Sequence, residues 1–164
     1  MIILGIDPGF ERLGCAVLKK DKSGEKIIYS TCITTDKKLF HEKRLLILAK
    51  ELKKIIAKYK PDVLATEKVF FFKNQKTALK VAETRGMILY LAALNNLDVV
   101  EFTPLEVKMS LTGYGRAEKR QVEEMVKQIL KIPKMPKSDD EIDAMAIAMT
   151  CSTGKKLKDI HRNL

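Results

Sequence analysis

The chain opens with Ile2-Ile3-Leu4-Gly5-Ile6-Asp7-Pro8-Gly9, and this stretch decides the fold that the sequence predicts. A short apolar run that ends in a Pro-Gly turn is typical of a fully buried strand. A carboxylate at the end of such a strand costs free energy to desolvate unless it is hydrogen-bonded, paired or bound to a metal. Asp7 therefore has two interpretations: it caps the turn, as Asp often does, or it is a metal ligand.

The rest of the chain adds strands and helices around this first strand, recognised by hydrophobic periodicity and by Gly and Pro punctuation. We expect strands at 2–7, 13–18, 27–34, 62–67 and 98–102, and helices at 41–59, 75–96, 103–112, 117–130 and 138–150. The first three strands form an antiparallel meander, and the fourth, which ends in Glu67, lies parallel to the first. The sequence thus predicts an α/β fold with a mixed five-stranded sheet and helices packed on it.

Local signals support two of these helices. Thr103 with Glu106, and Ser138 with Glu141, have the spacing of capping boxes, which predicts two helix starts. Gly86 lies inside a predicted helix, where Gly costs about 1 kcal/mol relative to Ala. We therefore expect another backbone to approach Gly86 closely, within the fold or across a dimer.

Length and composition favour one globular domain. The 164 residues are 46% apolar, enough for a substantial core, and we expect a domain over 1–153 followed by a basic, disordered tail at 154–164. The first apolar run is too short for a membrane span and lacks the features of a signal peptide, so we expect a cytoplasmic protein. Cys15, Cys32 and Cys151 are widely spaced, which suggests buried apolar residues and no disulfide or zinc site.

The formal net charge of +10 favours a polyanionic partner, because phosphate contacts displace condensed counterions. Nucleic acid is the natural candidate. An anionic membrane is less favoured, since no helix combines a basic polar face with an exposed aromatic face. Lysine-rich surfaces also serve solubility alone, so the charge by itself only favours this interpretation.

The last predicted helix carries two acids, Asp140 and Asp143, three residues apart and therefore on one face. An acidic first turn also complements the helix dipole, which is the simpler explanation. If Asp7 and Glu67 end adjacent parallel strands beside this helix, however, the four carboxylates form an all-oxygen site suited to Mg²⁺ or Mn²⁺. Two such ions activate water and stabilise the leaving oxygen of a phosphodiester, so the basic chain is a candidate metal-dependent nuclease.

Four motifs, in order, resemble those of the RuvC family of Holliday junction resolvases over nearly the whole chain. They are Gly5-Ile6-Asp7-Pro8-Gly9, Thr66-Glu67-Lys68-Val69-Phe70, the run from Gly113 to Val122, and Asp140-Glu141-Ile142-Asp143-Ala144-Met145-Ala146. The first motif alone is moderately specific, but the four together at this chain length are strongly specific.

The resemblance implies a ribonuclease-H-like fold, a homodimer with one active site per subunit, and paired nicks across a four-way DNA junction in recombination and repair. It implies Asp7, Glu67, Asp140 and Asp143 as catalytic ligands of two Mg²⁺ ions, which Mn²⁺ can replace, and the RuvA-RuvB branch-migration complex as partner. The family usually has small residues between the last two aspartates, where this chain has Glu141 and Ile142. We prefer Asp140 to Asp139 because only Asp140 keeps the three-residue spacing.

Six residues are candidates for DNA binding: Phe70, Lys76, Arg85, Lys108, Arg116 and Lys119. Phe70 is similar to an aromatic residue that the family stacks on an unpaired base, although alternating rings of its Phe run also suit a core. Lys108 and Lys119 are similar to basic positions of the family that lie near the scissile phosphate; each is otherwise a solvated helix lysine. Tyr114, between two glycines, is either a second stacking residue or an ordinary turn residue.

Three other functions are compatible with parts of the sequence. A ribonuclease-H-fold nuclease that acts on RNA or an RNA-DNA hybrid is the alternative enzyme. A nucleotide-binding protein of the sugar kinase and actin type would need a second phosphate loop and about twice the length. A DNA-binding protein without catalysis would not need Asp7, Glu67 and Asp143 together.

Overall fold

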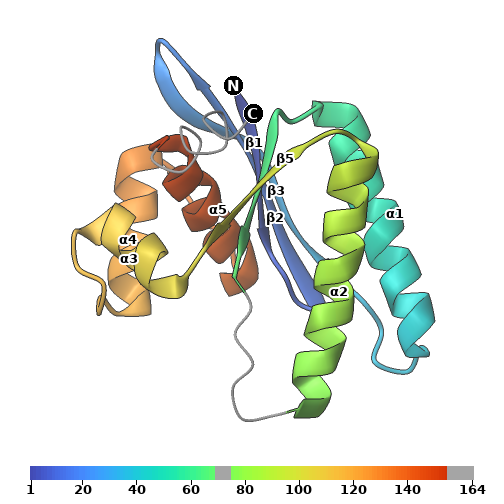
Figure 1. Ribbon diagram of the computed structural model, residues 1–164. Coiled ribbons are helices and arrows are strands. Elements are labelled where there is room, and N and C mark those ends of the chain that lie inside the picture. Colours follow the sequence, from blue (N-terminus) through green and yellow to red (C-terminus); the bar gives the residue numbers. More distant parts are fainter. Residues whose placement is uncertain (69–74, 155–164) are drawn as a thin grey trace.

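The computed structural model describes residues 1–68 and 75–154, with the side chains of 75–77 outside the description (Figure 1). Its elements are β1 (Ile2–Asp7), β2 (Arg12–Asp21), β3 (Gly24–Thr34), α1 (His41–Tyr59), β4 (Val63–Glu67), α2 (Gln75–Leu94), β5 (Asp98–Phe102), α3 (Pro104–Thr112), α4 (Lys119–Leu130) and α5 (Asp139–Ser152). Every predicted strand and helix is present. The tail that we expected at 154–164 lies outside the described residues, apart from Gly154. None of the helices described combines the length and apolar character needed to cross a membrane.

The predicted mixed sheet is confirmed. The five strands lie in the order β3-β2-β1-β4-β5, with β1, β2 and β3 antiparallel and β1, β4 and β5 parallel. Ile6 of β1 is in register with Thr66 of β4, so the next residues, Asp7 and Glu67, leave the sheet at the same edge. Both strands end at the lower edge of the sheet in Figure 1.

Helices cover both faces of the sheet: α1 and α2 lie on one side, and α3, α4 and α5 on the other (Figure 1). Alternating strand residues divide between two apolar cores. Leu4 and Ile6 face the α1–α2 core, whereas Ile3 and Ala65 face the core that contains α5. A sheet that is buried on both faces explains why β1 and β4 read as continuous apolar runs.

Helix α5 lies unusually close to the sheet because glycine and alanine face each other. A Cβ atom on Gly5 would lie 2.3 Å from the carbonyl oxygen of Ala144 and 2.8 Å from Cβ of Ala148. A Cβ on Gly14 would lie 1.9 Å from the carbonyl oxygen of Asp140. The two glycines therefore seat α5 against β1 and β2, and Gly14 places the acidic first turn directly on the sheet.

The first capping box is confirmed, and the second is wrong. Thr103 and Glu106 make both reciprocal hydrogen bonds at the start of α3. Ser138 is the N-cap of α5, but its hydroxyl donates to Oδ2 of Asp140 at 3.1 Å and makes no capping bond. The carboxylate of Glu141 accepts a hydrogen bond from Ser30 of β3. A contact with the sheet thus takes Glu141 away from the helix end, and a contact within the same turn takes Ser138 away.

The expectation that a backbone approaches Gly86 within the fold is also wrong. Among the residues that the structure describes, a Cβ atom at this position would meet nothing within 4 Å. The other alternative, an approach across a dimer, stays a prediction.

Candidate active site

The ends of β1 and β4 bring Asp7 and Glu67 together, as the strand pairing requires. Burial, and then the nearby charges of Asp143, Glu67 and Asp140, raise the pKa of Asp7 to about 7 against the opposing effect of Lys119. Burial, and then the charge of Asp143, also raises the pKa of Glu67. Two half-buried acids that repel each other and their neighbours favour a site for a cation.

The first turn of α5 supplies the other two acids. Asp7 is paired with Gly14 in the sheet, and the backbone of Asp140 rests on Gly14, so Asp140 lies beside the end of β1. One helical turn away, Asp143 accepts a hydrogen bond from Nζ of Lys119 at 3.1 Å. Burial raises the pKa of Asp143, while Lys119 opposes that rise.

All four predicted carboxylates therefore lie close enough to interact electrostatically, because the charges of the other three each raise the pKa of Asp7. Their oxygens are the donors that Mg²⁺ and Mn²⁺ prefer, and the acids carry more negative charge than their neighbours neutralise. The donor set thus fits a divalent ion. Among the described residues, no three of these acids are already close enough to hold one ion together. Side-chain rotation about fixed backbones would have to complete the coordination.

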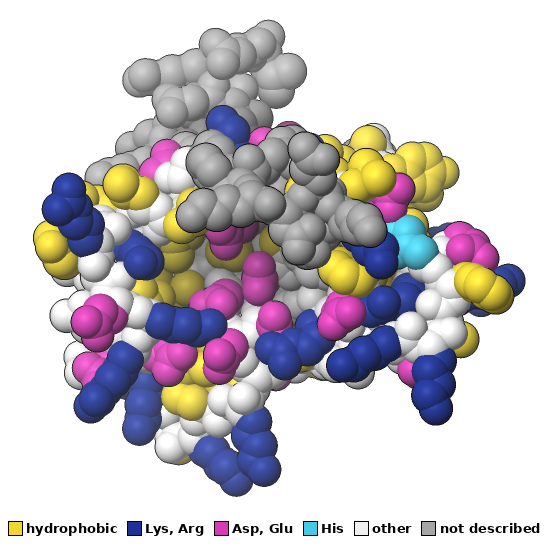
Figure 2. All heavy atoms as spheres, turned by 90° about the horizontal axis from the view of Figure 1, so that it is seen from below, with side chains coloured by type: hydrophobic (Ala, Val, Ile, Leu, Met, Phe, Trp, Pro, Cys, Tyr) yellow, Lys and Arg dark blue, Asp and Glu magenta, His cyan; other side chains and the backbone are white. Residues whose placement is uncertain are grey.

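A cavity of about 260 Å³ opens beside these acids. Glu67 and Asp143 line it together with Lys108 of α3 and Lys119 of α4, and the remaining wall consists of Pro104, Val107, Val122 and Ile147. Seen from below, Figure 2 shows acidic side chains gathered on this face with lysines and arginines around them. Acids for a cation and lysines for an anion in one cavity suit a substrate with a phosphate group.

The other predicted DNA-binding residues are spread over the fold. Arg116 is exposed in the loop between α3 and α4, as is Tyr114. Arg85 of α2 is bound to Glu101 of β5 through Nε at 3.0 Å and Nη2 at 2.5 Å, so its guanidinium is already engaged. Phe70 and the side chain of Lys76 lie outside the described residues.

Three residues next to the acids were missed by the sequence analysis. Arg12, the first residue of β2, binds Oδ2 of Asp140 through Nη2 at 2.5 Å. Cys32 was expected to be a buried apolar residue, yet it is half-buried and its thiol lies 3.7 Å from the same oxygen. Gly14 could have been found from the expected pairing of the first two strands, because that pairing sets a residue without a side chain opposite Asp7.

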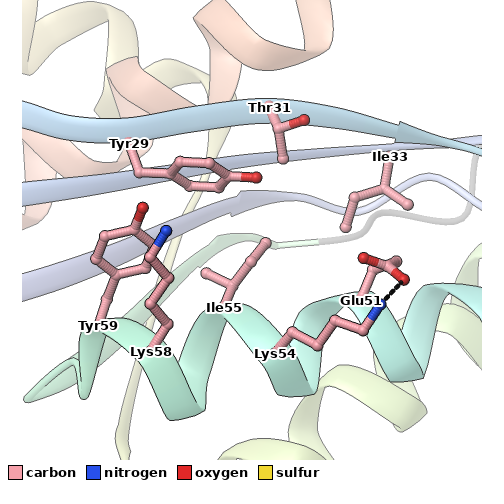
Figure 3. A pocket seen from close by; sticks show the side chains of 8 residues that line it. All are labelled: Tyr29, Thr31, Ile33, Glu51, Lys54, Ile55, Lys58 and Tyr59. Carbon is pink, nitrogen blue, oxygen red and sulfur yellow. Dashed lines mark hydrogen bonds and ion pairs between the residues drawn. The ribbon is translucent and has the colours of Figure 1, made fainter.

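A second cavity, of about 360 Å³, lies between β3 and α1 on the opposite face of the sheet from α5 (Figure 3). Tyr29 and Tyr59 stack there with ring centroids 5.1 Å apart. Nζ of Lys58 lies 5.1 Å from the ring centroid of Tyr59, and Lys54 binds Glu51 at 2.6 Å. The lysines are already engaged inside the cavity and only one acid lines it, so this cavity is not part of the candidate active site.

Comparison with known proteins supports the same conclusion as the geometry. The family model "Crossover junction endodeoxyribonuclease RuvC" matches residues 3–151. A crossover junction endodeoxyribonuclease RuvC from Ruminiclostridium cellulolyticum is 48% identical over 149 residues, which covers 91% of this chain and 90% of the relative. One from Thermosipho melanesiensis is 47% identical over 150 residues, covering 90% and 94%.

Two solved structures confirm the fold. Thermus thermophilus RuvC superposes with a TM-score of 0.88 and 27% identity, over 96% of this chain and 97% of that one. The same protein in complex with a Holliday junction substrate gives a TM-score of 0.90 and 28% identity, over 96% of each chain. The mixed sheet with helices on both faces is thus the ribonuclease-H-like fold that the sequence predicts.

Proposed function

Since this chain belongs to the RuvC family of crossover junction endodeoxyribonucleases, we propose that it resolves four-way DNA junctions by hydrolysing one phosphodiester bond in each of two opposing strands. The observation that carries this proposal is the convergence of Asp7, Glu67, Asp140 and Asp143 at one edge of the sheet, beside a cavity lined by two lysines. The relatives are deoxyribonucleases by name, which gives no support to the alternative of an RNA nuclease.

We assign the four carboxylates as catalytic ligands of two divalent ions, with Mg²⁺ as the natural metal and Mn²⁺ as a substitute. When bound, the metal supplies activated water and neutralises the charge that develops on the phosphate. Lys119 holds Asp143 in place at 3.1 Å, and its position in the cavity lets it contact the phosphate as well. Lys108 lines the same cavity and contributes a second positive charge to the phosphate.

DNA binding outside the cavity rests on positive charge and on stacking. The chain carries a formal charge of +10, and we propose that Lys76, Arg85 and Arg116 contact phosphates while Phe70 stacks on an unpaired base. Affinity for the junction should therefore fall steeply as the salt concentration rises. A flat response to salt would contradict phosphate-led binding.

We propose that the enzyme is a homodimer formed through α2. Leu79, Tyr90 and Leu94 are 62%, 66% and 57% exposed on one face of this helix, and Gly86 lies open between them. An exposed apolar stripe of this kind is typical of a protein interface, and a glycine in it lets a second backbone approach. Two copies would present two active sites to the two strands that must be cut.

The dimer is tested by Leu79→Glu combined with Tyr90→Glu, with Ile129→Glu on α4 as the matched control, since Ile129 is also an exposed apolar residue. Sedimentation should show monomers for the double variant and dimers for the control. A double variant that remains dimeric would exclude α2 as the interface.

In the cell, we place the protein in the cytoplasm and propose that it acts with the RuvA-RuvB branch-migration complex.

The proposed function is tested by cleavage of a synthetic four-way DNA junction, a linear duplex and an RNA-DNA hybrid, each with Mg²⁺ or with a chelator. We expect symmetric nicks in the junction alone, and only with Mg²⁺. Cutting of the hybrid would favour an RNA nuclease, and binding of the junction without any cutting would favour a protein that only binds DNA.

A further inference from the structure

The carboxylate of Asp140 is held from one side only. Its Oδ2 oxygen accepts from Nη2 of Arg12 at 2.5 Å and from the hydroxyl of Ser138 at 3.1 Å, and the thiol of Cys32 lies 3.7 Å away. Within residues 1–68 and 75–154, no hydrogen bond reaches Oδ1. The three donors therefore leave one oxygen of Asp140 available.

Without these donors, Asp140 would turn toward solvent. It lies in an acidic first turn with Asp139 and Glu141, and its backbone rests on Gly14, the sheet partner of Asp7, so these like charges lie near one another. Repulsion of this kind favours side-chain rotamers that separate the charges. A positive group on the outer oxygen of Asp140 opposes that rotation, and Arg12 is the cation in contact with that oxygen.

The sheet places Arg12 for this contact. Arg12 is paired with Thr34 at the start of β2, and two residues later Gly14 supports the backbone of Asp140. The same strand thus fixes both the backbone and the side chain of this acid. A guanidinium suits the task because it stays charged and offers several N–H groups in a rigid plane. Its side chain is 54% exposed, so it reaches Asp140 from the solvent side of the site.

We propose that Arg12 is a positioning residue of the active site, which holds Oδ2 of Asp140 so that Oδ1 is presented to a divalent cation. This inference rests on the proposed function, because it takes Asp140 to be a metal ligand. Partners of metal ligands typically contribute a factor of about 10 to 100 to metal affinity. A cation beside a metal site also repels the metal, so the sign of the effect tests the proposal directly.

The test is the affinity of the full-length protein without DNA for Mn²⁺, followed by electron paramagnetic resonance of the unbound ion. We expect Arg12→Gln to weaken Mn²⁺ binding about tenfold, at the lower end of the range for such partners. Arg12→Lys, which keeps the charge but not the planar group, should recover part of the loss. Arg120→Gln is the matched control: it makes the same change in an arginine that binds Glu124 on the outer side of α4.

Tighter Mn²⁺ binding by Arg12→Gln would show that Arg12 only competes with the metal, and unchanged binding would show an ordinary surface ion pair; either result overturns the proposal. Thermal unfolding of each variant checks that the fold is kept. Junction cleavage measured at increasing Mg²⁺ concentration distinguishes an error in the role of Arg12 from an error in the proposed function. If the proposal holds, Arg12→Gln needs more Mg²⁺ but regains most of its rate at saturation, whereas a native protein that never cuts the junction contradicts the function itself.

Discussion

The acids on the strands and the acids on α5 reach the same site but are neutralised differently. Asp140 and Asp143 each contact a cation of a neighbouring element, Arg12 and Lys119. Asp7 has no such contact among the described residues, and burial raises its pKa to about 7. The helix acids therefore each have a cation of the protein beside them, whereas Asp7 depends on an added cation. The strand end is where a bound metal should change the protein most.

The sharpest test of this difference replaces one acid of each kind. Asp7→Asn and Asp140→Asn should both reduce junction cleavage by about a thousandfold or more, since metal catalysis is worth several kcal/mol and each 1.36 kcal/mol is tenfold. In chelator at pH 8, Asp7→Asn should raise the melting temperature, because it removes a buried and repelled charge. Asp140→Asn should not, because it leaves Arg12 without its carboxylate.

Junction binding in chelator is the control for both variants, and it should stay close to that of the native protein. Equal changes in melting temperature for the two variants would show that the strand and helix acids do not differ. Loss of junction binding together with cleavage would instead point to a damaged fold.

The second prediction concerns pH. Because the pKa of Asp7 is about 7 in the folded protein and its ordinary value is 3.8, the folded state binds this proton more tightly than the unfolded chain does. Its contribution to stability is therefore complete below about pH 4 and is lost as the pH rises to 7. The loss is on the order of 4 kcal/mol, since each pKa unit corresponds to 1.36 kcal/mol.

Denaturant unfolding in chelator between pH 4 and pH 8 measures this loss as the difference between the native protein and Asp7→Asn. The variant should lack the decline. Excess Mg²⁺ should reduce the decline in the native protein, because the metal favours the charged form. Parallel curves for the two proteins would mean that Asp7 titrates normally.

Much of the fold could be predicted because strong local signals agree with the tertiary structure. The apolar runs ending in Asp7 and Glu67 identify two buried parallel strands, and Thr103 with Glu106 marks the start of α3. The capping box at Ser138 failed because donors and acceptors on the sheet and in the same turn compete for these side chains. Such competition depends on packing that no local pattern records.

The four acids of the candidate site were predictable for the same reason, since strand ends and helix spacing place them. Arg12 was not predictable, because its role depends on the contact between β2 and α5, which lie far apart in the sequence. Gly14 belongs to both cases: strand pairing sets it opposite Asp7, but only the structure shows Asp140 resting on it.

The third prediction concerns a variant that moves the acids of α5 away from the acids at the ends of β1 and β4. Gly14→Ala should destabilise the protein by about 1–3 kcal/mol, since overpacking a close contact costs that much, and should weaken cleavage by displacing Asp140. Gly115→Ala is the control, because its Cβ would meet the flexible side chain of Leu105 at 3.1 Å and not a backbone. Denaturant unfolding should show a clearly smaller effect for Gly115→Ala; similar losses would mean that α5 can shift to make room.

The smallest expected effect comes from making a helix acid resemble a strand acid. Lys119→Gln removes the cation that Asp143 contacts at 3.1 Å, so the pKa of Asp143, already raised by burial, should rise further. The ion pair is half-exposed, so its loss should cost only about 0.2–1 kcal/mol of stability near neutral pH.

Carbon-13 NMR titration of the aspartate carboxyl groups in chelator measures the change in the pKa of Asp143. Lys108→Gln is the matched control, because Lys108 lines the same cavity and is not among the causes named for the shift in the pKa of Asp143. If both variants shift the pKa of Asp143 equally, the overall charge of the cavity, and not the contact with Lys119, opposes the rise in that pKa.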